Sequence, residues 1–429
     1  MLATKVDEVG HGGFMTKFRL IPCSLFVLVG TIVLCATLST RALAQGDATK
    51  CGGKQVYSKT VLGKEYRIEA AEGEPGKFCV SWGDEKMKWE PKPFYEDELN
   101  KKGPMFYVEH LDLKFFPYNN SLEEREKFTA FDVQNSGTFF APFVAGPIDL
   151  EDSFDSHLYS PTGYRRDKTG MEFNKWYLEG KTKHVWDKDS TSGDPYRKYL
   201  FIFKAPQDLA KTAFFQVQYQ GQKEDDNFLY NPVVRKVRRL ATANRQDVIG
   251  GLVIRQEQNS LMTPIHNYKM IASQLMKVPD VDPTLGFEGG EDKQSPVAEY
   301  KRVDGLGEPC WVYETTPFRE DWWFAKQVNY VGLFTMVNWR TDSFDREGRL
   351  IQRIIWLQEL SAPSAVSHKT PEGRSTYLTW GGSVFKDYTT GFWVVAYPHE
   401  RTLNPPLPET IYNTNTLLQE PKTVDFYRK

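Results

Sequence analysis

The sequence lacks the short motifs that mark common catalytic sites. It contains no GxSxG, GxxxxGK[ST], GxGxxG or HExxH pattern, so no serine-hydrolase elbow, phosphate loop, dinucleotide fingerprint or zinc-protease helix is indicated. The seven histidines are scattered, and no CxxC pair is present, so we expect neither a metal site nor a cofactor. The sequence therefore favours a non-enzymatic role, and an enzyme acting on lipids or glycans is the least favoured alternative.

An excess of positive charge is also missing. The chain has 54 Lys and Arg against 56 Asp and Glu, a formal net charge of −2, which gives no support for a nucleic-acid partner. Only one long apolar run occurs, from Leu20 to Leu38. It follows Lys17 and Arg19 and ends before Ala42-Leu43-Ala44, the order of a cleaved signal peptide. We expect cleavage after residue 44 and a periplasmic or cell-envelope protein, with an uncleaved membrane anchor as the alternative.

Cysteine is scarce. Beyond the signal region only Cys51, Cys79 and Cys310 remain. An exported protein reaches a compartment where disulfides persist, but three thiols cannot all pair within one chain. Cys51 and Cys79 are near in sequence, so we predict that they form a structural disulfide and leave Cys310 as a buried thiol.

Aromatic residues are abundant, at 14% of the chain, and many lie in short β-like runs. Such runs predict a mainly β (α+β) fold with few helices. The clearest hairpin turns at Gly348, which can adopt the positive φ that a short loop needs. The predicted strands are Tyr199–Phe203, Phe214–Gln220, Asn267–Ala272, Cys310–Thr315, Val337–Phe344, Arg349–Glu359, Thr376–Trp380 and Gly391–Tyr397, and a capping box at Ser121 predicts a helix over Leu122–Phe131.

The expected organisation has four parts. Residues 1–44 are the signal peptide, and residues 45–193 form an irregular segment that packs on the sheet. Residues 194–398 form the β domain, and residues 399–429, rich in proline, form an extended tail.

A basic segment is the most distinctive local feature. Five cations fall within eleven residues: Arg235, Lys236, Arg238, Arg239 and Arg245. On a strand, Arg235 and Arg239 would share one face, and Lys236 and Arg238 the other. The functional interpretation is a rim that contacts anionic groups. The structural alternative is a solvated edge strand whose charges discourage pairing with other chains.

Tryptophans supply the other candidate site. Trp322 and Trp323 follow two acids and could line a ligand cavity, belong to the core, or sit at a membrane interface. Trp311, Trp339 and Trp356 lie on predicted strands. With Arg235, Arg238, Arg239 and Arg245, these five tryptophans make up the candidate ligand-binding residues.

Separated segments resemble an exported bacterial family described as outer-membrane lipoprotein-sorting-like, whose function is unknown. The resemblance is carried by Phe228–Leu240, Asn244–Gly251, Pro309–Pro317 and Asp345–Leu350, and covers roughly Tyr199 to Leu360. The family's usual Thr-Tyr-acid run after the glycine pair is absent, because Leu252–Glu257 reads differently.

The resemblance implies a fold of the LolA/LolB lipoprotein-carrier type, a curved antiparallel sheet forming a half-barrel. It also implies a periplasmic carrier whose partners are lipid or lipoprotein acyl chains and an inner-membrane export pump. In such a carrier, each buried CH₂ contributes about 0.8 kcal/mol and rim cations pair with headgroups. The alternative is a structural or adaptor protein of the envelope, and a cavity in the structure would separate the two.

Overall fold

The computed structural model describes most of the strand-forming part of the chain. The described residues are 51–90, 122–134, 149–176, 195–219, 223–241, 246–248, 251–259, 266–277, 307–361, 377–403 and 408–418. They all belong to one compact unit, Thr49–Lys429. The expected signal peptide and Arg245 lie outside the described residues. Within those residues, no helix is long and apolar enough to cross a membrane.

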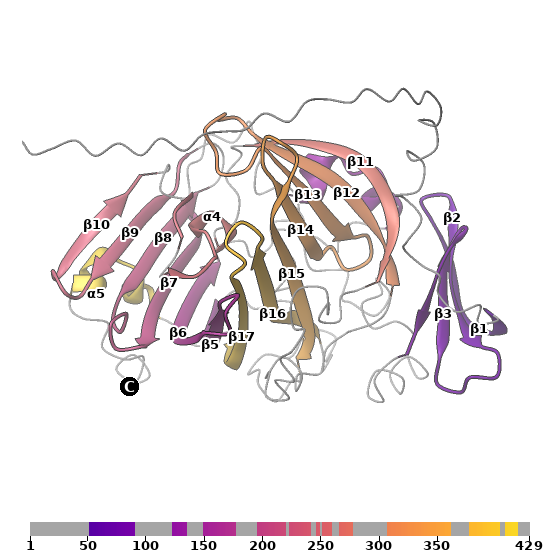
Figure 1. The fold of residues 1–429 in the computed structure, drawn as a ribbon, viewed down its shortest axis with the longest axis horizontal. Coiled ribbons are helices and arrows are strands. Elements are labelled where there is room, and N and C mark those ends of the chain that lie inside the picture. The colour runs from indigo at the N-terminus through magenta and orange to yellow at the C-terminus, as the bar shows by residue number, and fades with distance from the viewer. Residues whose placement is uncertain are drawn as a thin grey trace, which may run out of the picture. The chain divides into compact units, whose positions relative to one another are not determined.

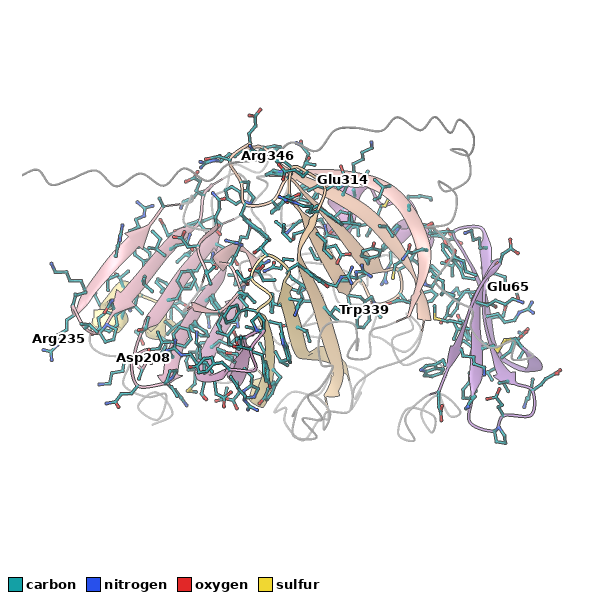
Figure 2. The ribbon with its side chains drawn as sticks, in the orientation of Figure 1. Glu65, Asp208, Arg235, Glu314, Trp339 and Arg346 are labelled. Carbon is teal, nitrogen blue, oxygen red and sulfur yellow. A yellow bond between two sulfur atoms is a disulfide. The ribbon has the colours of Figure 1, made fainter. Side chains whose placement is uncertain are left out.

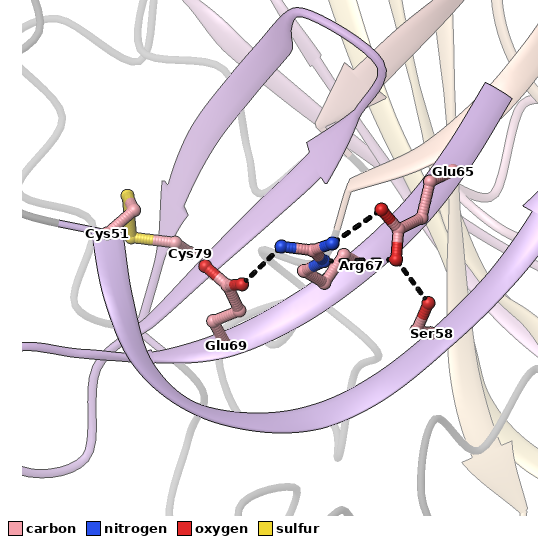
Figure 3. Close-up of polar contacts among 6 residues, drawn as sticks. All are labelled: Cys51, Ser58, Glu65, Arg67, Glu69 and Cys79. Carbon is pink, nitrogen blue, oxygen red and sulfur yellow. Dashed lines mark hydrogen bonds and ion pairs between the residues drawn. A yellow bond between two sulfur atoms is a disulfide. The ribbon is translucent and has the colours of Figure 1, made fainter.

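A small antiparallel sheet comes first in the chain. Its strands are β1 (Cys51–Val61), β2 (Lys64–Ala71), β3 (Phe78–Trp82) and β4 (Glu85–Trp89), hydrogen-bonded in chain order. Figure 3 shows the Cys51–Cys79 disulfide of this sheet and, beside it, Arg67 between two glutamates of its own strand. This is the pairing expected from the sequence, and Cys310 is a buried free thiol.

A second sheet contains thirteen strands among the described residues, and every pairing in it is antiparallel (Figure 1). The order is β10-β9-β8-β7-β6-β5-β17-β16-β15-β14-β13-β12-β11, and β10 and β11 are its two edges. The predicted class, a mainly β fold with an antiparallel sheet and few short helices, is confirmed for the described residues, and the sheet is open. The strands are β5 (Asp149–Tyr159), β6 (Arg165–Trp176), β7 (Pro195–Ala205), β8 (Ala213–Tyr219), β9 (Asp226–Asn231), β10 (Lys236–Leu240), β11 (His266–Lys277), β12 (Gly307–Pro317), β13 (Lys326–Gly332), β14 (Asn338–Phe344), β15 (Leu350–Ser361), β16 (Tyr377–Asp387) and β17 (Trp393–Leu403).

The predicted strands all occur, and most are longer than expected. The hairpin of β14 and β15 pairs Phe344 with Leu350 and Arg340 with Ile355. Gly348 in its turn has φ 77°, a conformation that favours glycine because it carries no Cβ. The return strand packs apolar residues on both faces, with Ile354 in one cluster and Ile355 in another.

Three expectations on chain organisation differ from the structure. Strands β5 and β6 come from the segment expected to be irregular, so the boundary at residue 193 falls inside the large sheet. The predicted helix is interrupted: α2 spans only Leu122–Arg125, and a second helical segment over residues 130–134 begins where Asp132 accepts hydrogen bonds from Thr129. The tail is not fully extended. It forms η6 (Glu409–Ile411) and α5 (Thr414–Leu418), whose apolar side chains pack on the sheet.

The core of the large sheet lies on both of its faces. Along β7, Leu200 and Ile202 point to one face, while Tyr199, Phe201 and Phe203 point to the other, as the two-residue period of a strand requires. The first face is covered by the C-terminal helices, and Figure 1 shows α5 beside β8, β9 and β10. A strand that is apolar on both faces shows no alternation, which is why its orientation could not be predicted from the sequence.

Candidate functional site

The predicted cations lie on the β9–β10 hairpin at one edge of the sheet. Arg235 is in the turn, not in the strand, so it does not share a strand face with Arg239 as predicted. Its φ of 49° lies in the left-handed region, which is not extended backbone. The strand-like alternation of side chains that the sequence suggested therefore does not include Arg235. Arg238 is exposed on β10, and Arg239 forms an ion pair with Asp226.

The predicted tryptophans have mixed surroundings. Trp322 and Trp323 converge on Glu257, which accepts hydrogen bonds from both indoles, so they fix the segment that contains α4 (Gln256–Asn259). Trp311 is buried and stacks on Phe128. Trp356 packs edge-on against Phe385, with ring centroids 5.8 Å apart.

The cations and the tryptophans do not form one site. Along the sheet, β10 and β15 are eight strand spacings apart, about 40 Å at the usual spacing. An acyl chain covers about half of a bilayer's hydrocarbon core, roughly 15 Å. A lipid whose headgroup pairs with Arg238 therefore cannot place its chain against Trp356 along this sheet.

A different set of residues comes together on one face of β5 to β9, which we name the aromatic–polar face. Strand pairing aligns them: Phe201 lies opposite Phe214, Tyr199 opposite Gln216, and Gly170 opposite Phe154. Only the register of five strands brings these side chains together. The face comprises Phe154, Ser156, Lys168, Gly170, Glu172, Asn174, Arg197, Tyr199, Phe201, Phe203, Phe214, Gln216, Gln218 and Asn227.

Aromatic rings form the middle of this face. Phe201 contacts Phe154 and Phe203, with ring centroids 5.0 and 4.6 Å apart. Phe214 and Tyr199 extend the row. Gly170 makes room for it, because a Cβ there would lie 2.7 Å from the ring of Phe154. Burying a phenylalanine contributes about 1.5–3 kcal/mol, so the row is a strongly apolar cluster, and its rings are themselves buried.

A buried guanidinium marks one end of the row. Arg197 Nε donates to Asn174 Oδ1 at 2.8 Å, Nη1 donates to Gln218 Oε1 at 3.3 Å, and the group lies 4.8 Å from the ring of Tyr199. Gln218 in turn donates to Asp225 at 3.4 Å. This end therefore carries both a cation and an anion, joined through an amide.

The same end contains acceptor atoms without a partner. Gln216 Oε1 and Asn227 Oδ1 are buried and accept no hydrogen bond from any described residue. Their amide nitrogens are already used, on Asp225 Oδ2 and on the Asp225 carbonyl. A buried acceptor left unpaired costs about 1–3 kcal/mol, so two such atoms favour a group that donates hydrogen bonds.

A buried lysine marks the other end. Lys168 lies on β6 opposite Ser156, whose buried hydroxyl has no hydrogen-bond partner among the described residues. Burial lowers the pKa of Lys168 to about 8, with a further contribution from the charge of Arg166. Lys168 and Asn174 are six residues apart on β6, a distance of about 20 Å, and Asn174 accepts a hydrogen bond from Arg197. The two cationic ends thus flank an apolar row of acyl-chain length.

The opposite face carries a relay that sequence spacing could not reveal. His157 Nδ1 lies 2.6 Å from Asp167 Oδ1, and Nε2 lies 2.6 Å from the Tyr397 hydroxyl. Burial alone would raise the pKa of Asp167, but hydrogen bonds from Arg165 and His157 outweigh it and the pKa is lowered. Tyr397 is buried and 240 residues from His157, so the relay ties β17 to β5.

A buried carboxyl group forms another polar cluster. Glu308 Oε2 accepts the N–H groups of Phe334 and Thr335, at 3.1 and 3.3 Å, and Oε1 accepts the Thr335 hydroxyl and the Trp339 indole. Arg125 donates to the carbonyl of Phe334 at 2.8 Å. Both side chains thus hold the β13–β14 turn, and Trp339, labelled in Figure 2, is part of this cluster.

Most of the similarities between this chain and known proteins are to solved structures. A family model described as an uncharacterized protein matches residues 196–270, and no curated protein matches the chain. A "putative outer membrane lipoprotein-sorting protein domain" from Vibrio parahaemolyticus is 16% identical, with 63% of this chain and 91% of that chain covered and a TM-score of 0.45. A DUF1329 family protein from Desulfovibrio piger is 15% identical, with coverages of 67% and 97% and a TM-score of 0.46.

A LolA superfamily protein from Nitrosomonas europaea is 11% identical, with coverages of 67% and 99% and a TM-score of 0.40. These proteins include the lipoprotein-sorting group that the sequence segments resemble. At these identities and TM-scores, the similarities identify neither a family nor a ligand.

Proposed function

We propose that this protein binds lipid or lipoprotein acyl chains in the cell envelope and shields them from water. The observation that carries the proposal is the aromatic row of Phe154, Phe201, Phe203 and Phe214 between the buried cations Lys168 and Arg197. An acyl chain suits the apolar middle, at about 0.8 kcal/mol per buried CH₂. A phosphate suits Lys168, because charge-assisted hydrogen bonds are the strong ones, whereas the Arg197 end already carries the anion Asp225 and suits a group that donates hydrogen bonds.

The role is binding and carriage, not catalysis. Envelope localisation rests on the signal-like segment before Gln45. A carrier needs a source of cargo, and we propose an inner-membrane export pump as the donor. This part fails if N-terminal sequencing of the mature protein finds residues 1–44 still attached.

Co-purified ligand tests the proposal. Native mass spectrometry of protein prepared without detergent should show a bound lipid or fatty acid. The Lys168→Met variant should bind anionic lipids more weakly while neutral lipids bind as before, because only a charge is lost. A ligand-free mass, with no saturable uptake of a fluorescent fatty acid, would favour the structural or adaptor role instead.

A further inference from the structure

The β9–β10 hairpin presents apolar side chains to solvent at its tip. Four residues, Pro232 to Arg235, join the strands, and Val233 and Val234 are 84% and 58% exposed. Asn231 Oδ1 accepts the Val233 N–H at 2.9 Å, which fixes the start of the turn. Two exposed valines in an ordered turn are a feature that the stability of the hairpin does not explain.

Unpaired cations surround these valines. Arg235, Lys236 and Arg238 are exposed, and none forms an ion pair or side-chain hydrogen bond with any described residue. Figure 2 shows Arg235 at the outer tip of the hairpin, pointing away from the sheet. The sequence from 227 to 246 contains no Asp or Glu, although the whole chain has a net charge of −2. The positive field is therefore local to this hairpin.

Protection of the sheet edge accounts for only part of this pattern. Cations on β10 discourage pairing with another chain, as edge strands require. The valines, however, lie in the turn, where there is no edge to protect. Apolar tips flanked by Lys and Arg are suited to the boundary between lipid headgroups and acyl chains, where the cations meet phosphates.

We propose that the β9–β10 hairpin docks the protein on the surface of a membrane that contains anionic phospholipid. The valines enter the headgroup boundary, and Arg235, Lys236 and Arg238 contact phosphates. This inference deepens the proposed function, because β9 also carries Asn227 of the aromatic–polar face, so docking would bring that face near the lipid source. Docking itself does not require that the face binds acyl chains.

Vesicle flotation tests the inference. The full chain should bind vesicles of phosphatidylcholine with phosphatidylglycerol far better than phosphatidylcholine alone, and added salt should weaken binding. Replacing Arg235, Lys236 and Arg238 together by Gln should lower affinity about 100-fold, at roughly fivefold per cation. Replacing Val233 and Val234 by Ser should lower it about tenfold.

A matched control is available elsewhere on the surface. Phe318 is also exposed, at 62%, but lies beside an Arg319–Asp321 ion pair, so Phe318→Ser should leave vesicle binding unchanged. Equal binding to neutral and anionic vesicles, or undiminished binding by the hairpin variants, would overturn the inference. The two proposals separate, because hairpin variants should still bind a fatty-acid probe, whereas Lys168→Met should still dock on vesicles.

Discussion

Glu308 should make stability depend on pH in a predictable direction. Burial raises its pKa from 4.5 to about 7, since desolvation outweighs its four hydrogen bonds, which favour the charged form. The unfolded chain has released this proton by about pH 5, whereas the folded chain keeps it until about pH 7. Stability contributed by this group is therefore present at low pH and lost as pH rises through the folded pKa.

The magnitude follows from the same shift. At 1.36 kcal/mol per pKa unit, a shift from 4.5 to about 7 is worth about 3 kcal/mol. Glu308→Gln removes the titrating group. The measured quantity is the unfolding free energy of the wild type minus that of the variant. This difference should fall by about 3 kcal/mol between pH 4.5 and 7. Above about pH 8 the difference should be flat.

Urea unfolding at fixed ionic strength measures this difference. Glu314→Gln is the control, because it removes a carboxylate from the surface of the same strand, where it pairs with Lys326. A difference curve for Glu308→Gln that stays flat from pH 4.5 to 8 would refute the reasoning. A curve that rises with pH would show that the hydrogen bonds outweigh burial.

Three further outcomes are expected. Replacing Cys51 and Cys79 by Ser should cost about 3–4 kcal/mol in the unfolding free energy, from the loop-closure entropy of a 28-residue separation, and thiol labelling of the denatured, unreduced wild type should modify one cysteine outside the signal region. Gly170→Ala should destabilise the fold by about 1–3 kcal/mol in urea unfolding, because its Cβ overlaps Phe154. Lys168→Met should stabilise the fold by about 1–3 kcal/mol at pH 7 in urea unfolding, because burial lowers the pKa of the lysine from 10.5 to about 8. Between pH 8 and 10.5 the unfolded wild-type chain binds more protons than the folded chain, so the stabilisation should vanish as the pH approaches 10.5.

Local patterns were sufficient to predict eight strands of the large sheet but not their neighbours, and the strands before residue 193 were missed. The β14–β15 hairpin was visible because alternating aromatic strands flank Gly348. The pairing of β17 with β5 joins residues far apart in the sequence, and no local signal specifies it. For the same reason, β5 and β6 were expected outside the sheet, although they lie in its middle.

The candidate site was harder to predict than the fold. The cations Arg235, Arg238 and Arg239 stood out because they are adjacent in sequence. Arg197 and Lys168 did not, because each is an ordinary cation until the sheet buries it. Residues 197–203 are mostly apolar or aromatic, so the sequence hides which side chains share a face.

Two adjacent residues of β7 allow the most direct test of acyl-chain binding. Phe203 belongs to the aromatic–polar face, whereas Ile202 packs on the opposite face with the C-terminal helices. Saturable binding of a fluorescent fatty acid should weaken about 30-fold in Phe203→Ala, from the lost ring contact, and should be unchanged in Ile202→Ala at matched stability. Equal effects of the two substitutions, or no saturable binding by the wild type, would contradict the account.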